Sequence, residues 1–282
     1  MNTTHLRTEP GAEGGASTMP PIAKDGDPVR IALGVEYDGT AYSGWQRLSH
    51  RQTVQGALER ALSFVANESI TVGCAGRTDA GVHARCQVAH FDSEAERGDG
   101  WLRGTNSNLP GDVAVRWAQV VDGDFHSRYS ATARSYRYTI INRSVRPALD
   151  ARFATWIRAP LDAGAMHGAA QGLIGENDFS AFRTIACQSR TPMRNVHSIA
   201  VSRDEERVIV DIQANAFLHH MVRNIVGSLL PVGRGERPQE WLAQLLAGKN
   251  RDLAGPTAPA SGLCFLGPRY PSRFGLPCEV SG

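Results

Sequence analysis

Residues 73–84 read Gly-Cys-Ala-Gly-Arg-Thr-Asp-Ala-Gly-Val-His-Ala, and they place one carboxylate, Asp79, in a short glycine-flanked turn between two apolar, strand-like runs. Glycine tolerates backbone angles that other residues resist and lets another molecule approach the main chain. Two interpretations stay open from these residues alone. Asp79 is either a reactive carboxylate on a loop held by a rigid scaffold, or part of an ordinary turn that forms an ion pair with Arg77.

Apolar periodicity on both sides of this turn predicts an α+β chain of two halves. A helix is expected at residues 53–67, where Val54, Leu58, Ala61, Leu62 and Val65 share one face and Thr53 can cap. With strands at 29–37, 70–76, 86–91 and 113–121 and a helix at 101–108, the order is strand-helix-strand-strand-helix-strand, which is ferredoxin-like.

The same order of elements is predicted again downstream, without any residue-level repeat. We expect strands at 134–142, 195–203, 207–215 and 262–266, and helices at 162–173, 217–232 and 238–247. The resulting division is a mobile tail at 1–28, a first half at 29–124, a second half at 125–275 and a C-terminal tail at 276–282. Two such halves place their sheets side by side with a cleft between them.

Charge is uneven along this chain of 282 residues, although its net charge is only +2. Residues 125–158 contain seven arginines against one acid, with four phenylalanine and tyrosine rings interleaved before residue 139. Guanidinium groups bind phosphate and aromatic rings stack on bases, so this segment favours an RNA partner. A solvated strand face is the alternative.

Cysteine and histidine patterns bear on compartment and metal binding. The five cysteines are odd in number and none has C-x-x-C spacing, which favours a reducing, cytoplasmic compartment. We find no apolar run near the roughly 18 residues of a membrane span and no signal-peptide core, so no membrane partner is expected. His83, His219 and His220 have no third ligand at a suitable spacing, so we expect no metal site.

Six blocks, in order along the chain, resemble the tRNA pseudouridine synthase A family. Residues 76–84 resemble the family's catalytic motif. The other five blocks are residues 37–46, 108–112, 125–131, 136–138 and 215–223, and together the resemblance runs from about residue 29 to residue 274.

The resemblance implies an RNA-modifying isomerase that converts uridine to pseudouridine at positions 38, 39 and 40 of the tRNA anticodon stem-loop, without cofactor or metal. It also implies the pseudouridine synthase fold, in which two ferredoxin-like halves share a mixed sheet around a central basic cleft, and a homodimer. Two alternatives from other classes are a catalytically inert RNA-binding module and a hydrolase with an aspartate nucleophile.

The chemistry explains why one carboxylate suffices for this isomerisation. The N1–C1′ bond breaks, the base turns and C5 joins C1′, so no atoms or electrons are gained. Asp79 can attack C1′ or take the proton at C2′, and the sequence does not choose between the two routes. By resemblance, Arg223 lies near this carboxylate and Tyr136 packs against the target uridine. The alternatives are a surface arginine on the helix and a core aromatic, and for Tyr138 we expect the core aromatic. Arg77 is either an ion partner or also helps to displace the base.

Further residues match family segments that contact tRNA. The arginines would hold phosphates and the rest would line the path of the RNA. These are Arg97, Phe125, His126, Ser127, Arg128, Tyr129, Ala186, Cys187, Gln188, Ser189 and Arg190.

Overall fold

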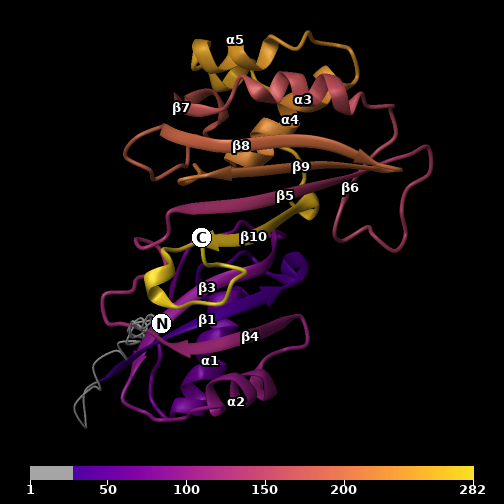
Figure 1. Ribbon diagram of the computed structural model, residues 1–282. Coiled ribbons are helices and arrows are strands. Elements are labelled where there is room, and N and C mark those ends of the chain that lie inside the picture. Colours follow the sequence, from indigo (N-terminus) through magenta and orange to yellow (C-terminus); the bar gives the residue numbers. More distant parts are fainter. Residues whose placement is uncertain (1–27) are drawn as a thin grey trace, which may run out of the picture.

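One mixed sheet runs through the molecule (Figure 1). The computed structural model describes residues 28–282, so the predicted tail lies outside them except for its last residue. Eight strands follow the order β4-β1-β3-β10-β5-β9-β8-β7, while β2 pairs with β3 and β6 with β5. Their bounds are β1 Val29–Tyr37, β2 Gly73–Cys74, β3 His83–Ser93, β4 Val113–Val120, β5 Ala133–Asn142, β6 Thr155–Ile157, β7 Gly175–Asp178, β8 Met193–Asp204, β9 Arg207–Ala214 and β10 Leu263–Arg269.

The first half confirms the predicted ferredoxin-like order. Strands β4, β1, β3 and β2 lie in that sequence and every neighbouring pair is antiparallel. Helix α1 (Val54–Ala66) begins as predicted, because the Thr53 hydroxyl accepts a hydrogen bond from Gly56 N at 3.3 Å. Helix α2 (Gly100–Asn108) packs beside it.

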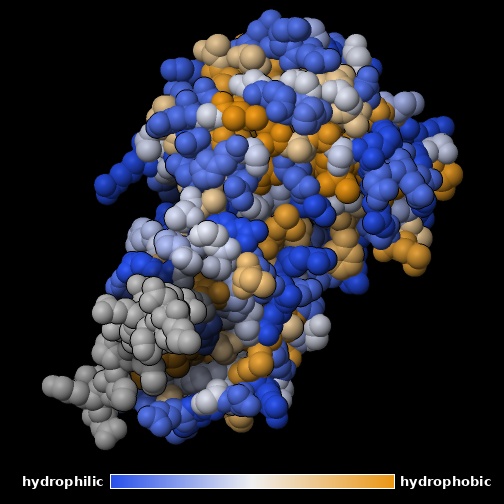
Figure 2. Space-filling view, viewed as in Figure 1, coloured by the Kyte–Doolittle hydropathy of each residue, from blue (hydrophilic) through white to orange (hydrophobic). Residues whose placement is uncertain are grey.

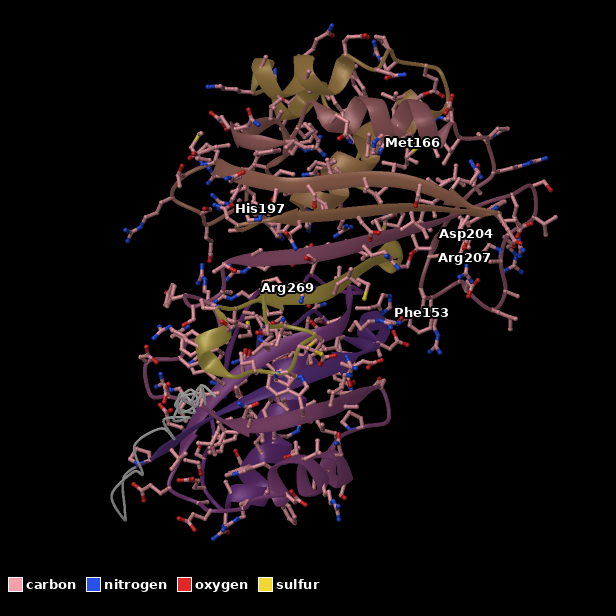
Figure 3. The ribbon with its side chains drawn as sticks, in the orientation of Figure 1. Phe153, Met166, His197, Asp204, Arg207 and Arg269 are labelled. Atoms are coloured by element: carbon pink, nitrogen blue, oxygen red, sulfur yellow. The ribbon has the colours of Figure 1, made fainter. Side chains whose placement is uncertain are left out.

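The second half repeats this arrangement with β10, β5, β9 and β8, again antiparallel throughout. Helices α3 (Ala163–Gln171), α4 (Met221–Gly233) and α5 (Trp241–Gly248) lie together at this end of the molecule (Figure 1). Met166 projects from α3, and Asp204 and Arg207 face each other across the end of the predicted β8–β9 hairpin (Figure 3). Short 3₁₀ segments occupy Gly39–Ala41, Ser180–Phe182, Arg251–Leu253, Ala260–Gly262 and Ser272–Phe274.

The last strand joins the halves. β10 pairs with β5 antiparallel and with β3 parallel, and the parallel contact consists of Cys264 with His83 and Phe265 with Ala84. His83 begins β3, so the turn that carries Asp79 opens directly at the joint. Segments that are far apart in sequence therefore meet around this turn.

Apolar side chains fill both faces of the sheet. Ile31, Leu33 and Val35 belong to the larger core, which extends into the second half, whereas Ala32 points to a smaller core on the other face. Residues 276–282 were expected to be a tail, yet Val280 is fully buried in the smaller core. On the face shown in Figure 2, hydrophilic residues cover most of the surface, and apolar ones gather in the region of α3, α4 and β8.

Two predicted elements differ in extent. The strand expected at 70–76 is only Gly73–Cys74. Ala75 N still donates to Val88 O of β3 at 2.8 Å, and the chain then enters the turn that carries Asp79. The helix expected from residue 217 begins at Met221, because His220 adopts the left-handed conformation with φ of 61°. Two strands, β6 and β7, were not predicted. They are short, and β7 is the polar sequence Gly-Glu-Asn-Asp.

Candidate active site

The turn that carries Asp79 is held on both sides by buried groups. Thr78 O accepts a hydrogen bond from Trp45 N at 3.0 Å, and the Thr78 hydroxyl bonds the Tyr37 hydroxyl at 2.7 Å. Asp79 O accepts from Val82 N at 3.1 Å, and Gly81 completes the turn with φ of +77°. The Asp79 backbone is thus fixed by the scaffold, while its side chain stays 24% exposed.

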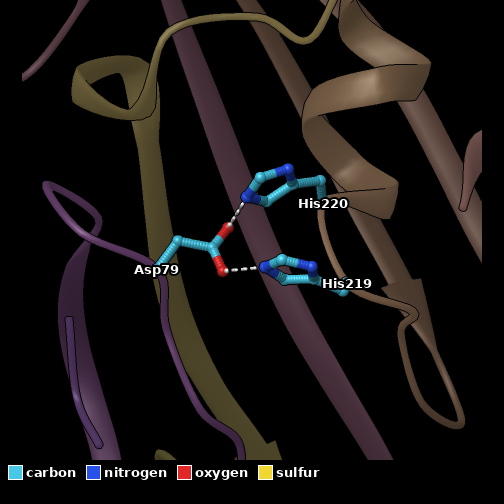
Figure 4. A group of neighbouring side chains, drawn as sticks. All are labelled: Asp79, His219 and His220. Carbon is cyan, nitrogen blue, oxygen red and sulfur yellow. Dashed lines mark ion pairs between the residues drawn. The ribbon is translucent and has the colours of Figure 1, made fainter. Parts of the chain in front are cut away.

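Two imidazoles and one guanidinium surround the Asp79 carboxylate, and Figure 4 shows the two imidazoles. One oxygen, Oδ1, lies 3.3 Å from His219 Nε2, and the other, Oδ2, lies 3.3 Å from His220 Nε2. Arg223 Nη1 lies 3.4 Å from Oδ2. All three partners come from the start of α4, which lies about 140 residues further along the chain.

Arg223 is held in place by the backbone on its other side. Its Nε donates to Ala258 O at 2.7 Å, and the side chain is only 15% exposed. Gly227, one turn further along α4, lets the segment that contains Ala258 approach the helix, because a Cβ at this glycine would lie 1.7 Å from Pro256 O. The structure therefore brings Arg223 close to Asp79, as the resemblance of the motifs implied.

The two histidines are held by the neighbouring loop and by the irregular backbone before α4. The Thr184 hydroxyl lies 2.8 Å from His219 Nδ1, which leaves Nε2 to face Asp79. Burial lowers the pKa of His220 below its usual value, although the nearby Asp79 acts in the opposite sense.

Tyr136 lies close to this carboxylate. Its ring packs between Phe217 and Phe265, with ring centroids 4.9 Å apart in both pairs. Burial, and secondarily the charge of Asp79, raises the pKa of the Tyr136 phenol well above its usual range. The hydroxyl is therefore a proton donor rather than a phenolate. Tyr138 is fully buried and bonds Thr155 and Pro259, in agreement with a core role.

Arg77 is exposed, and the ion partners of Asp79 among residues 28–282 are His219, His220 and Arg223. The interpretation of Arg77 as the ion partner of Asp79 is thus not supported by the geometry. Its side chain points to solvent beside the turn, which leaves the role in displacing a base as the remaining proposal.

Two residues expected to contact tRNA cannot do so through their side chains. Phe125 is 0% exposed and packs against Tyr270 and Phe274. Ser127 is also 0% exposed, and its hydroxyl bonds His90 Nδ1 at 2.8 Å. These predictions are wrong for the side chains because both residues anchor the segment to the sheet.

The other residues of the segment remain accessible. Arg128 and Tyr129 are exposed, with the Arg128 guanidinium 5.7 Å from the Tyr129 ring centroid. His126 is partly buried beneath Tyr129, and its Nδ1 accepts from the backbone N of Arg128 at 3.1 Å. The segment thus presents a cation and an aromatic ring on a fixed base.

Arg97 has a structural use that was not predicted. Its guanidinium donates to Val65 O and Ala66 O, both at 2.8 Å, and so satisfies carbonyl groups at the end of α1. The expectation that Arg97 holds a phosphate does not fit a side chain already committed in this way.

The predicted loop at residues 186–190 lies beside the start of α4. His219 N lies 3.4 Å from Cys187 Sγ, and Arg183 donates to Cys187 O and Ser189 O. Ala186, Gln188 and Arg190 are exposed. The loop therefore borders the group around Asp79 and leaves three residues free to contact a ligand.

The sequence did not reveal that His219 and His220 are neighbours of Asp79. The statement that these histidines have no third ligand at a suitable spacing was wrong, because Asp79 can supply one. Asp79, His219 and His220 each offer a donor atom, and these atoms lie within 4.8 Å of one another. Local spacing could not reveal this, because the carboxylate comes from the other half. Gln87 was missed as well. The Gln87 side chain donates through Nε2 to Gly76 O and accepts through Oε1 from Gly76 N. These two bonds fix the backbone at the start of the turn.

Paired ferredoxin-like halves, with one carboxylate at their joint facing an arginine and a buried tyrosine, define the pseudouridine synthase class, in agreement with the resemblance of the motifs. Comparison with known proteins narrows this. The model of the tRNA pseudouridine synthase family matches residues 34–130 and 169–271. The chain belongs to this family, and it is an isomerase that converts uridine to pseudouridine in tRNA.

Curated relatives agree with this assignment. The chain is 58% identical over 255 residues to the tRNA pseudouridine synthase A of Xylella fastidiosa (strain M23), covering 90% of this chain and 99% of that one. It is 57% identical over 256 residues to that of Xanthomonas axonopodis pv. citri (strain 306), covering 90% and 100%. A solved H/ACA ribonucleoprotein bound to a substrate RNA is similar at only 13% identity and a TM-score of 0.31, covering 71% of this chain and 44% of that chain.

Proposed function

We propose that this chain isomerises uridines 38, 39 and 40 of the tRNA anticodon stem-loop, with Asp79 as the carboxylate that acts on the sugar of a flipped nucleotide. The observation that carries the proposal is the position of Asp79. It stands at the joint of the two halves, 3.4 Å from Arg223 and close to Tyr136. The specific positions in tRNA rest on the resemblance of the motifs alone, while the relatives' names support tRNA as the substrate.

Each residue has a defined task in this reaction. A stem uridine must leave its stack, which costs a few kcal/mol, and the exposed Arg77 can occupy the vacated space or hold phosphate. Tyr136 packs against the flipped base, since stacking on an aromatic ring is worth roughly 1–3 kcal/mol. Arg223 orients the Asp79 carboxylate from a distance of 3.4 Å.

The bond changes balance without an added reactant. The N1–C1′ bond breaks and Asp79 either attacks C1′ or takes the C2′ proton. The uracil then turns and C5 forms the bond to C1′. On the first route this displaces Asp79 from C1′, and on the second Asp79 returns the proton to C2′. The C5 proton is lost, and N1 is protonated. Because burial raises the pKa of Tyr136, its phenol keeps its proton at neutral pH and can donate a hydrogen bond to the turning base.

Asp79→Asn keeps the shape of the side chain and removes its charge. We expect pseudouridine formation to fall on the order of 10³-fold, because the carboxylate is the reacting group. The measurement is single-turnover conversion of unmodified tRNA transcripts, with product mapped by position. Asp99→Asn, an exposed aspartate on the opposite side of the first half, is the control and should keep its rate. Near wild-type conversion by Asp79→Asn rejects the assignment, and product elsewhere in the tRNA rejects the proposed positions.

A homodimer and a cytoplasmic location complete the proposal, on the strength of the resemblance and the cysteine pattern. Among residues 28–282, no helix has both the length and the apolar character that a membrane crossing requires. Sedimentation of the free protein tests the dimer.

A further inference from the structure

The two imidazole contacts to Asp79 are too long for the hydrogen bonds that such groups normally make. Charge-assisted bonds between nitrogen and a carboxylate are about 2.7–2.9 Å, whereas both His219 and His220 stand at 3.3 Å. Two donors that both face a carboxylate at this distance leave room between them (Figure 4).

The two 3.3 Å contacts, each from one imidazole to a different carboxylate oxygen, match the edges of a metal coordination sphere in which Asp79 binds through both oxygens. Zinc binds imidazole nitrogen at about 2.0–2.1 Å and carboxylate oxygen at about 2.0–2.2 Å, so tetrahedral ligands stand roughly 3.3–3.5 Å apart. Asp79 and the two histidines supply three donor atoms within 4.8 Å of one another. Two nitrogens and one carboxylate with an open fourth position are a common zinc ligand set.

The surroundings of His219 fit a metal ligand as well. A ligating imidazole usually engages its second nitrogen with a hydrogen-bond partner that fixes the ring. The Thr184 hydroxyl stands 2.8 Å from His219 Nδ1, and Nε2 faces Asp79. His220 is held toward the same carboxylate by a left-handed backbone, a conformation that costs free energy in a non-glycine residue.

We propose that Asp79, His219 and His220 form a binding site for a divalent transition-metal ion such as Zn²⁺, and that the bound ion inhibits the enzyme. The inhibition rests on the proposed role of Asp79, since a coordinated carboxylate is not available to the ribose. The binding rests on the geometry alone. Arg223 opposes a cation here, so we expect ions that prefer imidazole and not Mg²⁺.

The test separates binding from inhibition. Co²⁺ absorption and calorimetry with Zn²⁺ report binding to the free protein. Initial rates on tRNA transcripts in constant Mg²⁺, with and without Zn²⁺, report inhibition. We expect one site per chain, loss of activity on Zn²⁺ addition, and recovery with a chelator. His219→Ala and His220→Ala should each abolish the Co²⁺ spectrum, and Thr184→Val should weaken binding about ten-fold.

Two controls identify the site. His197→Ala removes an exposed histidine on β8 (Figure 3), a strand that carries none of the three proposed ligands, and should bind metal like the wild type. Cys187→Ser removes the nearest thiol and should also retain the site. A thiolate charge-transfer band, or a spectrum unchanged in His219→Ala and His220→Ala, overturns the assignment to these residues.

The outcomes do not overlap with those for the catalytic role. Wild-type protein that binds no Co²⁺ overturns the metal site, even if Asp79→Asn is inactive. Metal binding at these residues without loss of rate overturns the inhibition, while the catalytic role of Asp79 is decided by Asp79→Asn in the absence of Zn²⁺.

Discussion

Arg97 and Arg128 are both exposed arginines, yet the groups around them give them different tasks. Arg97 is bonded to two carbonyls at the end of α1, whereas the Arg128 guanidinium lies over the Tyr129 ring and is free toward solvent. We predict that Arg97→Ala lowers the free energy of unfolding by about 1 kcal/mol with little change in tRNA affinity. Urea denaturation and filter binding measure the two quantities.

Arg128→Ala should have the opposite profile. Stability should change by less than about 0.5 kcal/mol, as for most surface substitutions, while KM for tRNA rises and the slope of log affinity against log salt falls by about 1. If Arg97→Ala reduces the salt slope and leaves stability intact, the structural assignment of Arg97 is wrong.

His90 predicts a pH dependence of stability. Burial lowers the pKa of His90 to about 4 in the folded chain, with the nearby His126 and Arg30 acting in the same sense and Asp92 against it. The unfolded chain therefore binds more protons between about pH 6.5 and 4, and stability falls as the pH is lowered through that window. The loss should be on the order of 2 kcal/mol.

His90→Asn is the informative variant, because its side-chain oxygen can still accept from the Ser127 hydroxyl and backbone, as His90 Nδ1 does. Urea midpoints at pH 7 and pH 4.5 should differ less for this variant than for the wild type. His197→Asn, at an exposed position, should retain the wild-type difference. An equal acid-induced loss in His90→Asn would refute the assignment.

Single residues also show how far motif reasoning reaches. The blocks of sequence placed Asp79, Arg223 and Tyr136 in one site, and the structure brings them together. The same blocks could not separate Phe125 and Ser127, which are fully buried, from Arg128 and Tyr129, which are exposed. Exposure depends on which face of the segment meets the sheet, and this is set by Tyr270 and Phe274, more than 140 residues away.

At the scale of elements, apolar periodicity located the regular helices and strands. It failed where the backbone is irregular next to the site, as at residues 217–220 before α4. Thr53 caps α1 as predicted, and Asp162, the first residue of the helix expected at 162–173, caps α3. The start of α4 was placed four residues too early, because the apolar pattern continues through residues 217–220 while the backbone does not. That irregular stretch is the one that turns His219 and His220 toward Asp79. Local pattern carries no information about such a distant partner.

The close approach of α4 to the segment at 255–258 leads to a prediction. Gly227→Ala would place a Cβ 1.7 Å from Pro256 O, and Ser228 on the same helix bonds Gly255 N at 3.0 Å. The segment must move, and Ala258 O, which holds Arg223, moves with it. We expect a loss of about 1–3 kcal/mol in unfolding free energy and a fall in kcat.

Gly248→Ala is the matched control in another helix. A Cβ there meets nothing within 4 Å, so stability should stay equal or rise slightly. Thermal denaturation and single-turnover rates on tRNA compare the two variants. Unchanged kcat in Gly227→Ala would show that Arg223 does not depend on this contact.

At the scale of the molecule, the order of elements predicted the topology, and the pairing of the halves came from β10. Two ferredoxin-like units follow from strand and helix order alone. The sequence pattern of β10 does not indicate that this strand inserts between β5 and β3. Each half on its own has an edge strand that could pair with β10, and only the packed sheet shows that β10 pairs with both. This insertion brings the Asp79 turn to the middle of the sheet.

Because the larger core extends through both halves, we predict that they unfold together, despite the expected boundary between residues 124 and 125. Leu58 on α1 and Leu242 on α5 are both fully buried in that core, one in each half. Leu→Ala at either position should lower the free energy of unfolding by about 2–5 kcal/mol.

If the halves are coupled, both variants should lower the midpoint of the entire urea transition, with coincident curves by far-UV circular dichroism and tryptophan fluorescence. Tryptophans lie in both halves, at positions 45, 101, 117, 156 and 241, so fluorescence reports on each. If Leu58→Ala instead splits the transition and leaves part of it at the wild-type midpoint, the halves are separate folding units and β10 is only a hinge between them.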